Sequence, residues 1–309
     1  MDLKLLIPTG YVPPVTTKED FDEYEKFRLT NGVKPLFDGY ELYYTNPDVI
    51  TSEIINFSPV AKKIKVVHCP LTKLKSGGFI NKMLQLVIFR YHPQDFYKTA
   101  RRSFIFGKEI GAKQILFHTT DLDLQKPQES IDFLLALQKE FSLEATIEIP
   151  HLAHVLAIAK YFCLLEKSGE PQKWLYVPSV FIQKFPRIKI TFDNCYTESS
   201  GLDIVSEWDK VSNNVSHIHF SAYSRGKPAH LTPNLKDHSH LVTFLQHVKK
   251  TSFNNELTLE ISPFQTFSEQ LVNYIFTLTA LFSFPLFKKQ QISNALRHLN
   301  STINFIRKI

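Results

Sequence analysis

The 309-residue chain has few cysteines and no long uncharged apolar segment. Its three cysteines, Cys69, Cys163 and Cys195, are odd in number and show no CxxC spacing, which argues against a disulfide framework or a structural zinc knuckle. The most apolar stretch, residues 274–287, is interrupted by Pro285 and is shorter than the roughly 20 residues of a membrane span. We therefore expect a protein of a reducing compartment with no role in a membrane.

Motifs for nucleotide binding and for secretion are also missing. No GxGxxG follows an expected strand and no GxxxxGK[ST] occurs, so a dinucleotide fold and a P-loop both lack their fingerprints. The first ten residues contain too short an apolar run for a signal peptide, and no small-residue cleavage pattern follows it. We interpret this stretch as a first strand and expect a cytoplasmic protein.

The composition is that of a globular chain with a large core, since 43% of the residues are hydrophobic, 13% aromatic and 21% charged. The formal charge of +6 suits a phosphorylated ligand or nucleic acid, although ordinary proteins often carry as much. Barrels of alternating strands and helices reach this length as one domain. We expect a single domain over residues 1–309, with an irregular insertion at about 71–95 and C-terminal helices at about 266–309.

Several short apolar runs end abruptly in a metal-binding or titratable side chain. The clearest is residues 188–193, which end in Asp193 and are followed by polar residues. Aspartate often ends a strand simply as a turn former, so this residue alone is weak evidence. The same kind of ending recurs in five further runs, at His68, His118, Glu148, His219 and Glu260. Helix-length segments separate these runs, which is the pattern of a parallel barrel with one active site at the carboxyl ends of its strands.

Eight strand patterns, each followed by a helical pattern, predict a closed (β/α)8 TIM barrel rather than an open doubly wound sheet. The expected strands are residues 3–8, 40–44, 64–68, 114–118, 145–148, 188–193, 215–219 and 256–260. The expected helices are residues 17–31, a short one ending near 57, 95–110, 127–141, 151–167, 179–184, 204–210 and 237–250, with a buried apolar helix at 274–287.

The order of these side chains resembles that of the xylose isomerase-like TIM barrel superfamily. This superfamily includes sugar and sugar-phosphate isomerases and epimerases, and also AP endonucleases of the endonuclease IV type, which act on abasic sites in DNA. The resemblance implies that one divalent ion is held by four residues: Glu148, Asp193, His219 and Glu260. Three carboxylates and an imidazole suit Mn²⁺, Zn²⁺ or Mg²⁺. His68 and His118 add nitrogen ligands that could hold a second ion.

Two stretches resemble the isomerase branch: residues 37–43, with the sequence FDGYELY, and the strand ending 217–221 with its loop 226–230. The function that follows is a divalent-metal-dependent sugar or sugar-phosphate isomerase or epimerase, working by proton transfer through a metal-stabilised enediolate. Glu148 and Glu260 would serve as base and acid. The candidates for holding the sugar or its phosphate are His230, Tyr196, Lys227 and Arg225.

The alternative is an AP endonuclease acting on DNA. Residues 68–70 (HCP) and 193–201 (DNCYTESSG) resemble motifs of that branch. Its third metal, however, lacks two expected ligands, because Tyr196 stands where the branch has a histidine and Pro228 where it has an aspartate. We therefore expect no more than two ions.

A third possibility is a non-catalytic barrel whose site has drifted into a binding role. The departures that motivate it are Tyr11, Tyr196, Ala222 and Pro228. The sequence leaves the identity of the sugar, the choice of metal and the oligomeric state open.

Overall fold

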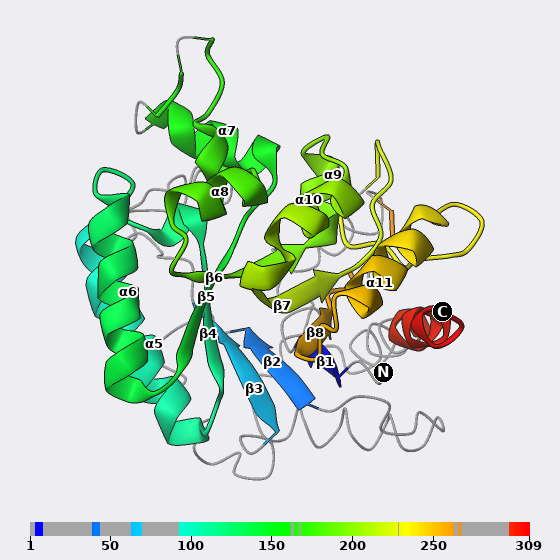
Figure 1. The fold of residues 1–309 in the computed structure, drawn as a ribbon, viewed down its shortest axis with the longest axis horizontal. Helices are drawn as coiled ribbons and strands as arrows, with labels where there is room; N and C mark the ends of the chain where they lie inside the picture. The colour runs from blue at the N-terminus through cyan, green and yellow to red at the C-terminus, as the bar shows by residue number, and fades with distance from the viewer. Residues whose placement is uncertain are drawn as a thin grey trace, which may run out of the picture. The chain divides into compact units, whose positions relative to one another are not determined.

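The protein is described from a computed structural model, which covers residues 4–8, 39–43, 63–69, 93–161, 164–166, 168–227, 229–262, 265–266 and 297–309. Eight strands form a closed parallel barrel in chain order, as the sequence predicts (Figure 1). The strands are β1 (Lys4–Pro8), β2 (Gly39–Tyr43), β3 (Ile64–His68), β4 (Gln114–His118), β5 (Glu144–Glu148), β6 (Lys189–Asp193), β7 (Val215–Phe220) and β8 (Glu256–Leu259).

Helices separate most of the strands. They are α5 (Pro93–Ile110), α6 (Pro127–Phe141), α7 (Leu152–Tyr161), α8 (Pro178–Lys184), α9 (Asn194–Ser199), α10 (Ile204–Val211) and α11 (His240–Lys250), with 3₁₀ turns η1 (Thr119–Asp121), η2 (Lys173–Leu175) and η3 (Ser212–Asn214). Residues 297–307 are also helical, within the region where C-terminal helices are expected. The helices expected at 17–31, near 57 and at 274–287 lie outside the described residues, as does the insertion up to residue 92.

The chain divides into two compact units. The first unit is residues 1–42, 193–212 and 217–309, and the second is residues 43–192 and 213–216. Each unit has its own buried core, and each contributes residues to a separate candidate site. The organisation as one domain stays a prediction.

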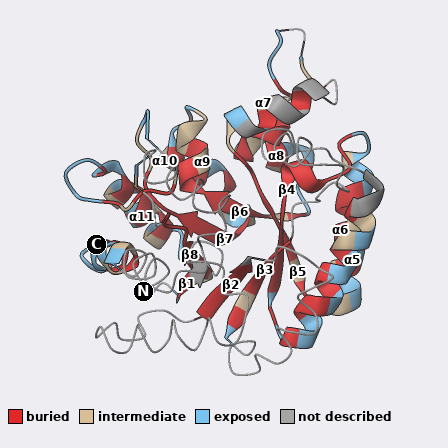
Figure 2. Cartoon of the chain, turned by 180° about the vertical axis from the view of Figure 1, so that it is seen from behind, coloured by how far each residue is buried: buried red, intermediate tan, exposed pale blue. Residues whose placement is uncertain are grey.

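In the second unit, β4 shows the alternation that builds the barrel. Ile115 and Phe117 point to one face, and the rings of Phe96 and Phe104 from α5 lie 6.2 Å from the ring of Phe117. Gln114 and His118, at alternate positions of the strand, are polar and buried. Figure 2 shows the strands almost entirely buried, while α5 and α6 have both buried and exposed faces. The face of β4 that carries Ile115 and Phe117 thus packs on α5, and the opposite face carries the polar side chains Gln114 and His118.

In the first unit, the core is built on aromatic side chains. Trp208 of α10 is fully buried, and its ring lies 5.7 Å from that of Phe244 in α11 and 5.8 Å from that of Phe253. Phe305, in the helical residues 297–307, stacks on Phe220 of β7 at 6.4 Å. The carboxyl-terminal segment is therefore part of the packing of this unit.

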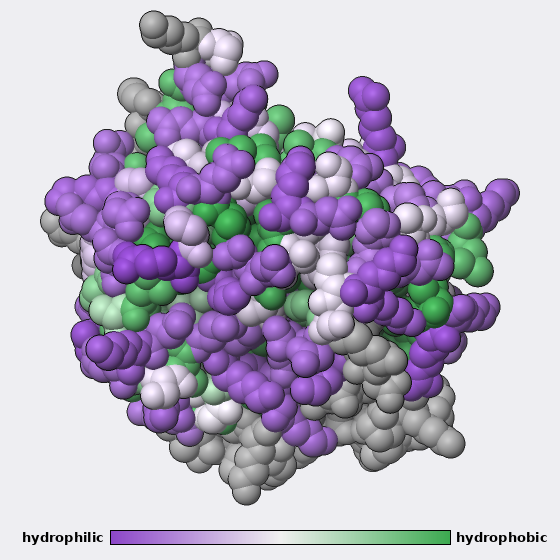
Figure 3. All heavy atoms as spheres, in the orientation of Figure 1, coloured by the Kyte–Doolittle hydropathy of each residue, from purple (hydrophilic) through white to green (hydrophobic). Residues whose placement is uncertain are grey.

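The surface shown in Figure 3 is mostly hydrophilic, with small scattered apolar areas. Within the described part of the chain, no helix has the length and the apolar character needed to cross a membrane.

Candidate metal centres

The first candidate site lies in the second unit and consists of His68, His118 and Glu148, which we call the His-His-Glu cluster. Each is the last residue of its strand, and His118 and Glu148 are direct neighbours in the β4–β5 register. His118 Nε2 lies 3.0 Å from Glu148 Oε2 and 3.3 Å from His68 Nε2, and all three side chains are buried. Two imidazoles and a carboxylate therefore meet at one point.

Asp121, in the turn η1, holds the far side of the His118 ring. Its Oδ2 accepts a 2.7 Å hydrogen bond from the backbone N–H of His118 and lies 3.2 Å from His118 Nδ1. Burial lowers the pKa of His118, but the charges of Glu148 and Asp121 and their hydrogen bonds outweigh it and raise the pKa to about 10. Positive charge is therefore favoured at this point, from a proton or from a cation.

The second candidate site lies in the first unit and consists of Asp193, His219 and Glu260, which we call the Asp-His-Glu cluster. One ligand atom from each lies within 4.8 Å of the others. His219 Nδ1 is 3.2 Å from Glu260 Oε2 and 3.9 Å from Asp193 Oδ2, and all three residues are buried. The sequence placed each of them at or next to a strand end, and the structure agrees: Asp193 ends β6, His219 is next to last in β7, and Glu260 directly follows β8.

Asp193 has a separate task for each of its carboxylate oxygens. Oδ1 accepts a 2.7 Å hydrogen bond from the backbone N–H of Tyr196 and so caps helix α9. Oδ2 is the atom that faces His219. The turn-forming role and the ligand role, which were alternatives in the sequence, are compatible in the same side chain.

His230 stands beside the Asp-His-Glu cluster in a left-handed conformation, with φ of 59°. Its Nδ1 lies 3.2 Å from Ser221 Oγ and 3.4 Å from Glu260 Oε2, and its Nε2 lies 3.2 Å from the hydroxyl of Tyr196. Left-handed backbone is uncommon outside glycine and persists only where surrounding contacts enforce it.

Backbone hydrogen bonds on both sides of His230 hold it in this left-handed conformation. Ala222 and Leu231 pair as an isolated antiparallel bridge, with bonds of 2.8 and 2.9 Å. The backbone N–H of Ser262 donates to the His230 carbonyl at 2.8 Å. The ends of β7 and β8 thus fix His230 where it faces Glu260.

The other predicted ligand-binding residues stand farther out in the same loop. Arg225 and Lys227 are exposed on either side of Gly226, which has a φ of 76°. Their role in holding a phosphate stays a prediction. Tyr11 and Pro228, two of the departures from the resembled family, lie outside the described residues.

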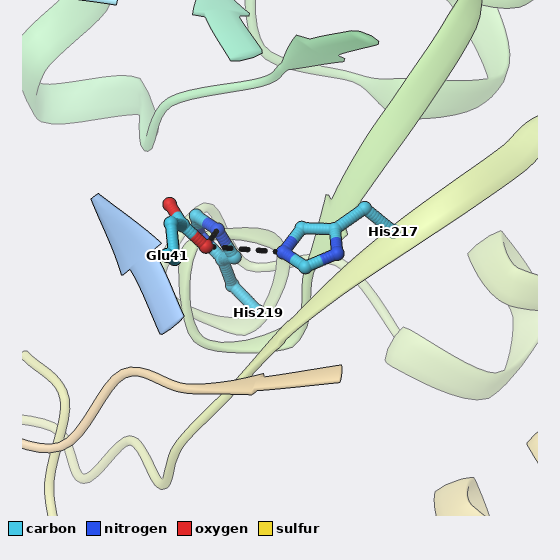
Figure 4. A group of neighbouring side chains, drawn as sticks. All are labelled: Glu41, His217 and His219. Carbon is cyan, nitrogen blue, oxygen red and sulfur yellow. Dashed lines mark hydrogen bonds and ion pairs between the residues drawn. The ribbon is translucent and has the colours of Figure 1, made fainter. Parts of the chain in front are cut away.

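Three residues near the Asp-His-Glu cluster were missed in the sequence. Glu41 of β2, His217 of β7 and Thr258 of β8 contact one another on the Nε2 side of His219. Figure 4 shows Glu41 with the two imidazoles. Two signals could have found them. A lone glutamate interrupts the apolar residues of β2, and the H-x-H spacing of β7 puts both imidazoles on one face. Asp121 was also missed, because it follows its strand by three residues.

The donor atoms of both clusters fit a divalent ion. Carboxylate oxygens and imidazole nitrogens are the ligands that Mn²⁺, Zn²⁺ and Mg²⁺ take in different proportions. Negative groups this deeply buried need compensation, by protons or by a cation. These buried groups could therefore hold metal ions.

Comparison with solved structures supports the expected fold. A D-tagatose 3-epimerase-like protein aligns with a TM-score of 0.57 at 10% identity, over 90% of this chain and 97% of its own. An L-ribulose 3-epimerase aligns with a TM-score of 0.56 at 11% identity, over 99% of this chain and 96% of its own. The chain has the closed parallel (β/α)8 barrel fold, to which these two structures are similar.

A third neighbour, an AP endonuclease of family 2 from Brucella melitensis, aligns with a TM-score of 0.53 at 13% identity, over 89% of this chain and 98% of its own. No protein-family model and no curated protein sequence matches this chain. Both branches of the fold that the sequence resembles are thus represented among its structural neighbours.

Proposed function

We propose that the chain is a divalent-metal-dependent sugar or sugar-phosphate isomerase or epimerase. The observation that carries the proposal is the Asp-His-Glu cluster, in which an imidazole nitrogen stands 3.2 Å from one buried carboxylate and 3.9 Å from another. Two structural neighbours named as epimerase or epimerase-like support the reaction class.

We assign Glu148 to the same ion as the Asp-His-Glu cluster, from strand order. Neighbouring strands of a closed parallel barrel end on the same side, and active sites in such barrels form there. The two imidazoles of the His-His-Glu cluster would hold a second ion. A bound divalent ion would supply Lewis-acid stabilisation of negative charge on adjacent carbonyl and hydroxyl oxygens of the sugar.

The proton transfer itself falls to the carboxylates. We assign Glu148 and Glu260 as the pair that removes a proton from the carbon next to the carbonyl and returns one, because one carboxylate can be charged while the other holds the proton. His230 would hold Glu260, 3.4 Å away, and would orient the hydroxyl of Tyr196 toward a sugar hydroxyl. Arg225 and Lys227, being exposed and cationic, are assigned to a phosphate when the sugar carries one.

The second candidate function is an AP endonuclease, which the Brucella melitensis neighbour favours. The contacts of His230 argue against it. Its Nδ1 lies near Ser221 and Glu260 and its Nε2 near Tyr196, so both ring nitrogens already face partners within the protein. A third ion would have to displace one of these contacts and find a further ligand where Tyr196 stands.

The deciding experiment compares the two reactions in one preparation. Protein loaded with Mn²⁺ is incubated in deuterated water with a panel of ketoses and their phosphates, and separately with a duplex that contains one abasic site. We expect deuterium at a carbon next to the carbonyl of one sugar and no nicking of the duplex.

The control is Glu260→Gln, which keeps the size of the side chain and removes its charge. Deuterium exchange should be lost in this variant. Efficient nicking that also depends on Glu260 would overturn the isomerase assignment in favour of the endonuclease. Neither reaction in the wild-type protein would contradict both and favour a non-catalytic barrel.

A further inference from the structure

A buried hydrogen-bond network lies directly behind His219, on the side away from Asp193 and Glu260. Its centre is Glu41 Oε2, which lies 3.0 Å from His219 Nε2 and 3.1 Å from His217 Nε2. The hydroxyl of Thr258 donates to the same oxygen at 2.6 Å. In Figure 4, dashed lines join the glutamate to both imidazoles. None of the three charged or imidazole side chains is more than 1% exposed.

The chemistry of these groups determines where the protons lie. A carboxylate is only an acceptor, so each group that reaches Glu41 Oε2 must bring its own hydrogen. His217 can share its Nε2–H between Glu41 and the hydroxyl oxygen of Thr258, which is 2.9 Å away. The remaining donor is the Nε2–H of His219.

A proton on Nε2 has a direct consequence for the other nitrogen of the ring. In neutral imidazole one nitrogen carries the proton and the other offers a lone pair. With Nε2 protonated, the lone pair of His219 is on Nδ1, the atom that faces Glu260 Oε2 and Asp193 Oδ2. Three electron-rich atoms then point at one another, an arrangement that a cation between them stabilises.

We propose that Glu41 is a positioning residue, which holds His219 in its Nε2–H tautomer and so presents Nδ1 as the metal-binding atom. This inference rests on the proposed metal site of the Asp-His-Glu cluster. Carboxylates that orient metal-binding histidines in this way typically change metal affinity by about 10- to 100-fold when they are removed.

An ion bound by Glu41, His217 and His219 themselves is the competing interpretation of the same atoms, since one ligand atom from each lies within 4.8 Å of the others. It would require lone pairs on both Nε2 atoms, and Thr258 would lose the acceptor of its 2.6 Å hydrogen bond. It would also end the donor role of His219 Nε2 and move that proton to Nδ1, which would leave no lone pair for an ion between Asp193, His219 and Glu260. The hydrogen-bonded network satisfies more of these atoms at once.

The first test reads the tautomer directly. Two-bond ¹H–¹⁵N spectra of the histidine rings are recorded for the wild-type protein, metal-free and after addition of Zn²⁺. We expect a protonated His219 Nε2 in both states and a zinc-induced shift confined to Nδ1. An unprotonated Nε2 in the metal-free protein, or zinc bound through Nε2, would overturn the proposal. The metal-free spectrum is informative even when no zinc binds, so it separates this inference from the proposed metal site.

The second test measures Mn²⁺ affinity by calorimetry in Glu41→Gln and Glu41→Leu. We expect about 10- to 100-fold weaker binding in both, because glutamine can flip to offer N–H and leucine offers no acceptor. The matched control is Thr258→Val, which removes a hydrogen bond to Glu41 and keeps the Glu41 carboxylate that faces His219. The loss of Mn²⁺ affinity in Thr258→Val should be clearly smaller than in the two Glu41 variants. Equal affinity in Glu41→Gln, Glu41→Leu and the wild type would contradict the role of Glu41, whereas no binding by the wild type would contradict the metal site itself.

Discussion

The imidazoles of His118 and His219 each have a carboxylate beside both ring nitrogens. His118 has Glu148 on its Nε2 side and Asp121 on its Nδ1 side. His219 has Glu260 on its Nδ1 side and Glu41 on its Nε2 side. His118 faces its cluster with Nε2, whereas His219 faces its cluster with Nδ1. The orienting carboxylate is therefore beside Nδ1 in His118 and beside Nε2 in His219. When an ion replaces a proton, each orienting carboxylate would thus leave the lone pair on the nitrogen that faces its candidate site.

The two roles of Asp193 can be separated by substitution. Asp193→Asn keeps an oxygen that can cap α9 but loses the negative charge, so we expect the tightest ion to be lost with little change in stability. The control is Asp203→Ala, because Asp203 caps α10 at 2.7 Å without facing either cluster. This variant should lose about 1 kcal/mol and keep its metal. Elemental analysis and thermal unfolding measure both, and unchanged metal content in Asp193→Asn would contradict the assignment.

The role of Asp121 in orienting the His118 ring can be tested with Asp123 as the control residue. Asp121→Asn replaces an obligate acceptor with a side chain that can also donate, so the Nδ1–H tautomer of His118 is no longer enforced. We expect the weaker of two ions to bind about tenfold less tightly by calorimetry. Asp123→Asn is the control, since Asp123 is also buried but accepts from Gln125 and does not contact His118. Equal losses in the two variants would assign the effect to general destabilisation.

The places of the candidate ligands in the fold could be predicted from the sequence, because each stands at or next to the end of a strand. Glu41 and Asp121 could not. The pairing of Glu41 with His219 joins residues separated by 178 positions, and it depends on the register of strands that the sequence pattern does not fix. Asp121 is near His118 in sequence, but only the turn η1 brings its carboxylate back to the ring.

The helix boundaries that could be predicted are those marked in the sequence by a proline at the start or a glycine just after the end. Pro127 begins α6 at its first turn and Gly111, with φ of 72°, follows α5 directly, as the sequence indicated. Helix α9 was not expected, since its N-cap is Asp193, which the sequence pattern marked as a strand ending. Helix α11 begins at His240 and not at Asp237, because the side chain of Asn234 accepts from the Asp237 backbone and closes a turn first.

The contact between α5 and β4 gives a prediction at the level of these elements. A Cβ at Gly107 would lie closer to Ile115 Cδ1 than van der Waals contact allows. Gly107→Ala should therefore destabilise the protein by about 1–3 kcal/mol despite the better helix propensity of alanine. Ile115→Val removes that methyl group at a cost of about 0.5–1.5 kcal/mol. The double variant should be more stable than the sum of the two effects predicts, as measured by urea unfolding. Simple additivity would contradict the close packing of this helix on its strand.

For the whole molecule, the alternation of strands and helices was sufficient to predict the closed barrel and its strand order. The period-two pattern of each strand and its abrupt polar ending are local signals, so they survive without knowledge of tertiary contacts. The choice between the isomerase and endonuclease branches is not local. It depends on what surrounds His230, whose conformation is set by backbone bonds from the ends of two strands.

The most direct measurement of the central claim is a crystal structure of the protein soaked in Mn²⁺, with anomalous data collected at the manganese edge. We predict one strong peak bounded by His219 Nδ1 and by the carboxylates of Glu148, Asp193 and Glu260. A weaker second peak should lie beside His68 and His118, and none should lie beside His230. The absence of a peak at the Asp-His-Glu cluster, or a peak on the Nε2 side of His219, would contradict the account.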